Sequence, residues 1–178
     1  LEEKMIAEKP KSKLGIAHTR WATHGEPSEE NAHPHKSNER VYIVHNGIIE
    51  NYLDLKEFLK DEGYSFSSQT DSELIAHLLE YFLSKGNSMV DSMYLTKEKL
   101  DGAYAIAAID RENDKNVVIA RSKSPLLIGI GTDEFLAASD PLAIGQLTNE
   151  FIFLEDGDVA ELTSKSYTIF DDDKQKVN

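Results

Sequence analysis

Apolar residues in the middle of the chain recur every three to four positions, which is the spacing of one face of an α-helix. Three such stripes predict helices over residues 48–59, 74–82 and 89–100. The second stripe follows a capping-box pattern, Thr-Asp-Ser-Glu at 70–73, and precedes Gly86, a residue type that commonly ends helices.

Strand-length apolar runs flank this helical block. Two precede it, residues 14–18 (LGIAH) and 41–44 (VYIV), and the polar stretch 19–40 between them is predicted to be a loop. A short helix is expected over 141–147. A block of helices followed by a block of strands predicts the α+β class. Seven period-two runs, separated by short turns, predict antiparallel meanders over residues 103–110, 117–121, 126–130, 135–139, 151–154, 159–162 and 167–170.

Composition narrows the class of protein. The 178 residues suffice for one domain, and 40% hydrophobic residues are too many for a disordered acidic tail. A net charge of −13 argues against partners such as nucleic acids or anionic membranes. No apolar run has the ~20 residues of a membrane-spanning helix and no signal peptide opens the chain, so we expect a cytoplasmic domain. The chain has no cysteine, which excludes disulfides and thiolate sites within it.

The polar stretch contains the first candidate site. Arg20 offers a planar fork that suits a carboxylate. Trp21 is the only tryptophan, and its large ring is costly in a polar loop unless it packs against something. A surface arginine and a tryptophan that fills a gap in the core explain the same residues.

Two further positions have a structural and a chemical interpretation. Asn46-Gly47 follows a strand, as in a tight hairpin, but the predicted helix after it favours a junction where an amide and a backbone N–H converge on an oxyanion. Asp71 begins the second predicted helix, where it caps the helix or binds the ammonium of a ligand. The residues alone leave both choices open.

Six histidines invite a metal-site interpretation, and His33-Pro34-His35 would present two imidazoles. The chain lacks the His-Glu-x-x-His spacing of a zinc site, and nothing partners this pair at helical spacing. We therefore expect no metal and no cofactor, and a zinc site is the least favoured alternative.

Together the motifs resemble the glutaminase domains of the glucosamine-6-phosphate synthases, a family of class II glutamine amidotransferases. The resemblance runs from residue 14 to about 170 and implies the N-terminal nucleophile hydrolase fold, an αββα sandwich of two antiparallel sheets between helical layers. It implies one glutaminase domain over 1–178, with 171–178 beginning a linker to a sugar-isomerase domain. The matching segments are HTRWATHG, NAHPH, VHNGIIENY, QTDSE, GAYAIA, ARSKSPLLIG, ASD and FLEDGD.

The resemblance also assigns a pocket for L-glutamine. In it Arg20 binds the α-carboxylate and Asp71 binds the α-ammonium. Thr23 and His24 line the same pocket, and Trp21 helps to close it and to gate ammonia.

For catalysis, the resemblance makes the Asn46 side chain and the Gly47 backbone N–H an oxyanion hole. The family's nucleophile is an N-terminal cysteine in the opening Cys-Gly-Ile-Val-Gly, which this sequence lacks. We therefore expect that a preceding segment with the first strands is missing, so that the sandwich is incomplete and the chain does not hydrolyse glutamine. In the intact enzyme the released ammonia would convert fructose-6-phosphate to glucosamine-6-phosphate.

Two other functions fit the same motifs. The chain could be the glutaminase domain of another class II amidotransferase, or a glutamine-binding regulatory module without a nucleophile. We expect a homodimer, and strand exchange is one route to it because exposed sheet edges invite pairing.

Overall fold

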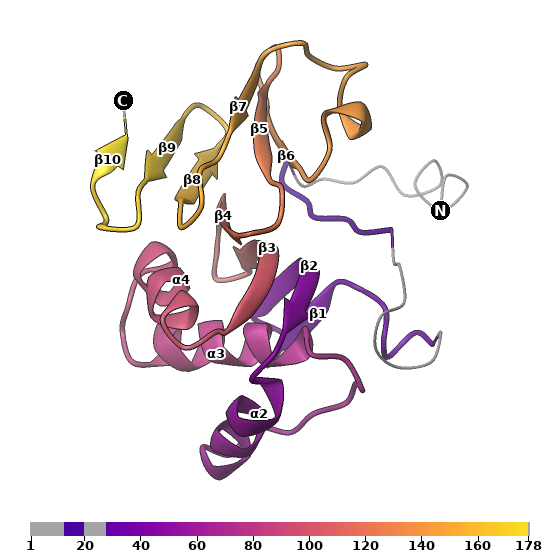
Figure 1. Ribbon diagram of the computed structural model, residues 1–178, viewed down its shortest axis with the longest axis vertical. Helices are drawn as coiled ribbons and strands as arrows, with labels where there is room; N and C mark the ends of the chain where they lie inside the picture. Colours follow the sequence, from indigo (N-terminus) through magenta and orange to yellow (C-terminus); the bar gives the residue numbers. More distant parts are fainter. Residues whose placement is uncertain (1–12, 20–27, 178) are drawn as a thin grey trace.

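A seven-stranded antiparallel sheet forms the centre of the computed structural model, which describes residues 13–19 and 28–177 (Figure 1). Its strands lie in the order β1-β2-β3-β4-β8-β9-β10. They are β1 (His35–Ser37), β2 (Val41–Ile49), β3 (Gly102–Asp110), β4 (Asn113–Ser122), β8 (Val159–Thr163), β9 (Tyr167–Phe170) and β10 (Lys176–Val177).

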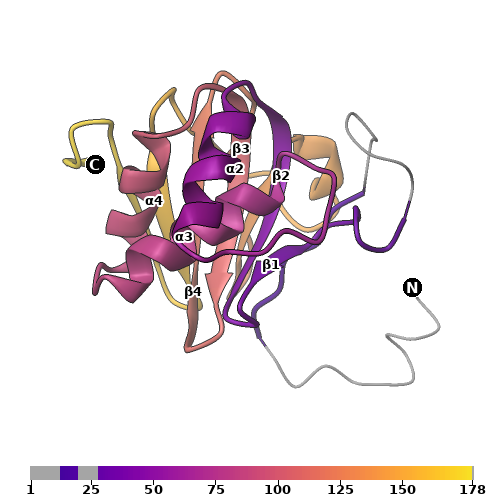
Figure 2. The same cartoon turned by 90° about the horizontal axis from the view of Figure 1, so that it is seen from below.

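Three helices cover one face of this sheet, and Figure 2 shows them in front of its strands. They are α2 (Tyr52–Asp61), α3 (Glu73–Ser84) and α4 (Met89–Lys97). Alternate residues of the strands, such as Ile43, Ile106 and Val118, face the helices and are fully buried with apolar residues of α3. This helix is buried on nearly all sides, because α2 and α4 pack against it as well as the sheet.

A three-stranded antiparallel sheet covers the other face, in the order β6-β5-β7. Its strands are β5 (Leu127–Ile130), β6 (Phe135–Ala138) and β7 (Phe151–Phe153). Ile128 packs in a second core with Ile119 and Ala160 of the large sheet. On the outer face, a Cβ at Gly129 would lie 2.6 Å from Cδ1 of Ile144, so the segment that follows the 3₁₀ helix η1 (Pro141–Ala143) covers the small sheet there.

These layers confirm the predicted α+β class and the two antiparallel sheets of the sandwich. All seven period-two runs are strands, and the three predicted helices are present. Gly86 ends α3 as predicted: its φ is 91°, and the N–H of Gly86 and of Asn87 donate to the carbonyls of Leu83 and Phe82. The short helix predicted over 141–147 forms only its first turn, with Asp140 accepting from the N–H of Leu142 at 2.8 Å.

The polar stretch 19–40 was predicted as a loop, but it contains β1. This strand pairs with β2 through a turn over residues 38–40, in which Asn38 and Glu39 have φ values of 48° and 54°. The N–H of Arg40 closes the turn on the carbonyl of Ser37 at 2.9 Å. Because a turn of this type normally contains glycine, the sequence concealed the hairpin.

The prediction of a helix from residue 48 was wrong at its start. β2 continues through Ile49, and α2 begins only at Tyr52. The predicted strand at 14–18 was also wrong, because this segment belongs to neither sheet, although its residues are alternately exposed and half-buried. That residues 171–178 begin a linker stays a prediction, although Lys176 and Val177 pair with β9.

No helix in the described part of the chain is long and apolar enough to cross a bilayer. Residues 13–19 and 28–177 also contain no group of three or more histidine or carboxylate side chains placed to hold a metal ion.

Candidate functional site

The predicted site residues fall in two groups. Arg20, Trp21, Thr23 and His24 lie outside the described residues. The structure describes the predicted oxyanion-hole residues, Asn46 and Gly47, and the predicted ammonium partner, Asp71.

Asn46 and Gly47 lie inside β2, where they pair with Ala105 and Tyr104 of β3. They therefore form neither the hairpin nor the strand-to-helix junction that the sequence suggested. Gly47 has a φ of 136°, and a Cβ there would lie 2.0 Å from the carbonyl oxygen of Ala103. Only glycine fits this backbone, and the neighbouring Asn46 is exposed.

Asp71 lies next to the same part of β2. Its side chain is almost fully buried, and Oδ2 accepts the backbone N–H of Ile49 at 2.8 Å, three residues after Asn46. In the described part of the chain, the pairing of β1 with β2 ends at Ile43. Beyond Ile43, on the same edge of β2, the Asp71 carboxylate accepts the backbone N–H of Ile49 in place of a strand.

The capping box predicted for α3 does not form. The N-cap residue is Ser72, and its side chain makes no capping bond. Thr70, the predicted cap, has its hydroxyl 3.0 Å from Nε2 of His35 instead. Asp71 therefore hydrogen-bonds to β2 and does not cap the helix that follows it.

His45 connects this carboxylate to the core side of β2. The hydroxyl of Ser72 lies 2.9 Å from Nδ1 of His45 and donates to Oδ1 of Asp71 at 3.4 Å. Burial lowers the pKa of His45 to about 4, against the opposing effect of the Asp71 carboxylate. His45 is therefore neutral near pH 7, and its buried Nε2 has no hydrogen-bond partner among the described residues.

The outer side of β2 carries a contact that the sequence did not reveal. Nε2 of His18 lies 2.6 Å from Oδ1 of Asn46. The His18 ring packs at a tilt of 37° against that of His33, with centroids 4.1 Å apart, and His33 in turn meets His35 edge-on at 4.6 Å. The only sequence signal was that His18 directly precedes the Thr-Arg-Trp segment, which says nothing about a partner 28 residues away.

Glu73 holds the segment that carries Asp71. Its carboxylate accepts the backbone N–H of Ser67 at 2.8 Å, the hydroxyl of Ser67 at 2.8 Å and the N–H of Ser68 at 2.6 Å. Burial alone would raise the pKa of Glu73, but these bonds and the imidazole of His77, 3.7 Å away, hold it well below its usual range. Sequence reasoning placed Glu73 in a cap and missed this role.

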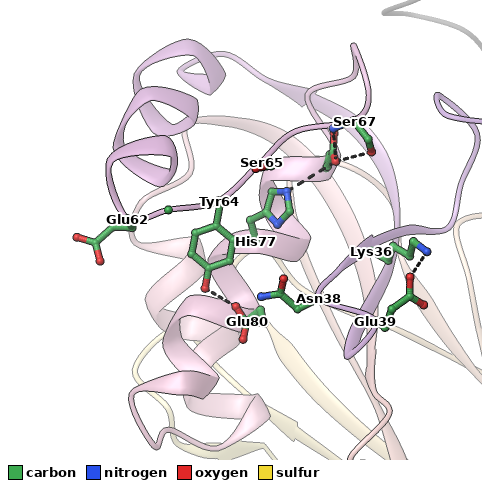
Figure 3. Close-up of a pocket in the computed structure, with 11 residues that line it drawn as sticks. Lys36, Asn38, Glu39, Glu62, Tyr64, Ser65, Ser67, His77 and Glu80 are labelled. Carbon is green, nitrogen blue, oxygen red and sulfur yellow. Dashed lines mark hydrogen bonds and ion pairs between the residues drawn. The ribbon is translucent and has the colours of Figure 1, made fainter.

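A separate pocket of about 500 Å³ lies on the far side of Glu73, between the β1–β2 turn and α3 (Figure 3). It is strongly acidic, and the hydroxyl of Tyr64 donates to Glu80 within it. Its described lining contains none of the predicted site residues; it comprises Lys36, Asn38, Glu39, Glu62, Gly63, Tyr64, Ser65, Ser67, Glu73, His77 and Glu80.

Known proteins resemble this chain in sequence and in fold. The chain is 53% identical over 163 residues to a glutamine–fructose-6-phosphate aminotransferase (isomerizing) of Shewanella oneidensis, covering 92% of this chain and 27% of that protein. It is 50% identical over 170 residues to the protein of the same name from Haemophilus influenzae, covering 95% of this chain and 28% of that protein. The chain thus spans about a quarter of the length of these curated relatives.

Solved structures agree on the fold. A glutamine phosphoribosylpyrophosphate amidotransferase of B. subtilis superposes with a TM-score of 0.73 at 24% identity, over 89% of this chain and 35% of that one. At that identity the likeness shows the fold alone, which is that of the N-terminal nucleophile hydrolase amidotransferases. A family model described as a glutamine amidotransferase domain matches residues 18–146, more than half of the chain. The chain therefore belongs to the class II glutamine amidotransferase domain family.

Proposed function

We propose that this chain is the glutaminase domain of an enzyme that transfers glutamine-derived ammonia to fructose-6-phosphate and makes glucosamine-6-phosphate. The observation that carries the proposal is the buried Asp71 carboxylate, placed against β2 beside Asn46 and Gly47. It puts an anionic group for an ammonium close to amide donors for an oxyanion, which is the combination that hydrolysis of a glutamine side chain needs. The fructose-6-phosphate acceptor is taken from the relatives, which are glutamine–fructose-6-phosphate aminotransferases.

Asp71 binds the α-ammonium of glutamine and Arg20 its α-carboxylate in this proposal. Oδ2 of Asp71 already accepts one backbone N–H, and a carboxylate oxygen has a second lone pair for an ammonium. Thr23 and His24 line the pocket, and Trp21 closes it.

Asn46 and Gly47 then stabilise the tetrahedral intermediate. A cysteine thiolate attacks the side-chain carbonyl carbon of glutamine, and the carbonyl oxygen becomes an oxyanion. The Asn46 side-chain amide and the Gly47 N–H donate to this oxygen. The nitrogen takes up the proton that the thiol lost, the C–N bond breaks with release of ammonia, and water cleaves the thioester to glutamate and the free thiol.

The thiolate has to come from outside these 178 residues, which contain no cysteine. We therefore propose that the 178-residue chain alone releases no glutamate from glutamine, whereas the full-length protein does. In the full-length protein a sugar-isomerase domain receives the ammonia, and the protein acts in the cytoplasm as a homodimer.

The test measures glutamate and glucosamine-6-phosphate from L-glutamine and fructose-6-phosphate. The full-length protein should form both, and the 178-residue chain neither. Arg20→Ala in the full-length protein should weaken glutamine binding by about 2–5 kcal/mol, the usual loss when one partner of a desolvated charge pair is removed. Glutamate without the amino sugar would point to another acceptor, and turnover by the 178-residue chain would refute the thiolate assignment.

A further inference from the structure

We infer that His18 is a positioning residue for the oxyanion hole: it fixes the side-chain amide of Asn46 so that the NH₂ group faces the reacting oxygen. The inference rests on the proposed function, because the role of Asn46 belongs to that proposal. It gives a role to His18, a residue of the HTRWATHG motif to which the resemblance assigned none.

The contact itself sets the direction of the amide. Nε2 of His18 lies 2.6 Å from Oδ1 of Asn46. An amide oxygen only accepts hydrogen bonds, so Nε2 of His18 carries the proton and donates it. This bond engages the oxygen end of the amide and leaves both N–H groups of Nδ2 for another acceptor. An unrestrained asparagine would present either end.

The rest of the His18 ring supports the same tautomer. Nδ1 is buried and has no hydrogen-bond partner among the described residues, which suits a bare lone pair better than an N–H. The ring also packs against that of His33, with centroids 4.1 Å apart and planes tilted by 37°, which restricts its rotation. The donor is therefore aimed by packing and does not depend on a free side-chain rotation.

Stability does not account for this bond. Asn46 is exposed, so its amide could bond to water equally well, and a hydrogen bond between exposed side chains adds little to folding. A preorganised donor in an oxyanion hole contributes far more, because removing one such donor lowers kcat by about 10²–10³-fold. Loss of orientation alone, with the amide still present, should lower kcat by roughly 10-fold.

The experiment uses the full-length enzyme that carries this chain and follows glutamate release at varied glutamine concentration. His18→Leu removes the N–H but keeps a side chain of similar bulk, whereas His18→Gln keeps an N–H at a similar reach. We expect His18→Leu to lower kcat about 10-fold with KM for glutamine within about 2-fold, and His18→Gln to recover most of kcat.

Combining His18→Leu with Asn46→Ala isolates the route of the effect. If His18 acts only through Asn46, the double variant should be no slower than Asn46→Ala alone. Additive losses, or a change in KM without a change in kcat, would overturn the inference. Wild-type enzyme that releases no glutamate would instead overturn the proposed function.

A measurement on the wild-type protein covers the case in which the variants fail to fold. Nitrogen-15 NMR of the imidazoles at pH 7.5 distinguishes the two tautomers of a neutral histidine. The inference requires the proton of His18 on Nε2, and a proton on Nδ1 would overturn it whatever the variants do.

Discussion

Glu73→Gln tests how the segment that carries Asp71 is held. The Glu73 carboxylate is the common acceptor for three donors, the N–H and hydroxyl of Ser67 and the N–H of Ser68. Glutamine has the same shape but offers one oxygen, and its NH₂ group would face at least one of these donors. The substitution thus replaces a hydrogen bond by two N–H or O–H donors that face each other, and it creates no cavity.

The loss of stability follows from these contacts. Hydrogen bonds to a charged group contribute about 1.5–3 kcal/mol each, and a buried donor left without an acceptor costs about 1–3 kcal/mol. The loss should be greatest for the N–H of Ser68, because Ser68 is buried and water cannot replace the lost acceptor. Because one oxygen remains for the other donors, we expect Glu73→Gln to lower the free energy of unfolding by about 2–4 kcal/mol.

Urea denaturation of wild type and variant at pH 7 measures the difference, with Glu80→Gln as the control. Glu80 is also a buried carboxylate on α3, but its hydrogen-bond partner is the Tyr64 hydroxyl, to which a glutamine oxygen still serves as acceptor. We expect the control to cost less than about 1 kcal/mol. Equal losses in the two variants would refute the proposed anchoring by Glu73.

The pH dependence provides a second check on Glu73. Its pKa is lower in the folded protein than in the unfolded chain, where a glutamate titrates near ~4.3. The unfolded state therefore binds the proton first, and the stability that Glu73 contributes is complete above this pH and lost as the pH falls below it. The gap between wild type and Glu73→Gln should narrow below about pH 4.

Three further predictions concern the strand beside Asp71. Asp71→Asn should raise the KM of the full-length enzyme for glutamine at least about 10-fold, because it removes the charge proposed to pair with the ammonium; an unchanged KM would exclude that role. Gly47→Ala should destabilise the fold by roughly 3 kcal/mol in urea melts, since the new Cβ would overlap the carbonyl oxygen of Ala103 and φ is 136° there. The pKa of His45, lowered from 6.5 to about 4 by burial, means that the unfolded state takes up the proton first as the pH falls. Wild-type stability should therefore drop by about 3 kcal/mol between pH 6.5 and 4, and His45→Asn should remove most of this drop.

The sequence predicted the parts of the fold where side chains alternate on a regular backbone. The runs 103–110, 117–121 and 159–162 of the large sheet alternate because one face meets the helices and the other meets the small sheet, so period two is physically enforced. It failed where backbone conformation came from non-local pairing. Asn38 and Glu39 adopt positive φ only because β1 pairs with β2, and no local signal distinguishes them from a loop.

The same contrast between local pattern and non-local contact applies to the candidate site. Motif resemblance singled out Asn46, Gly47 and Asp71, and the structure places the Asp71 side chain against β2, the strand that carries the other two. Their partners were not predictable, because the bonds from Ile49 and His18 span 22 and 28 residues of the chain. The predicted capping box shows the limit clearly, since the local pattern was present but Thr70 contacts His35, 35 residues away, and Glu73 bonds Ser67 and Ser68 instead of the cap.

Two glycines with the same φ of 136° lie where the end of β2 pairs with the start of β3: Gly47 on β2 and Gly102 on β3. A Cβ on Gly47 would strike the carbonyl of Ala103, and one on Gly102 would lie 2.1 Å from the carbonyl oxygen of Ile48. In both cases the atom that the new Cβ would meet belongs to the backbone, so no rotation of a neighbouring side chain can relieve the overlap. Each single substitution therefore carries its own cost in stability, and the place of the Gly47 N–H is set by the close backbone contact between β2 and β3.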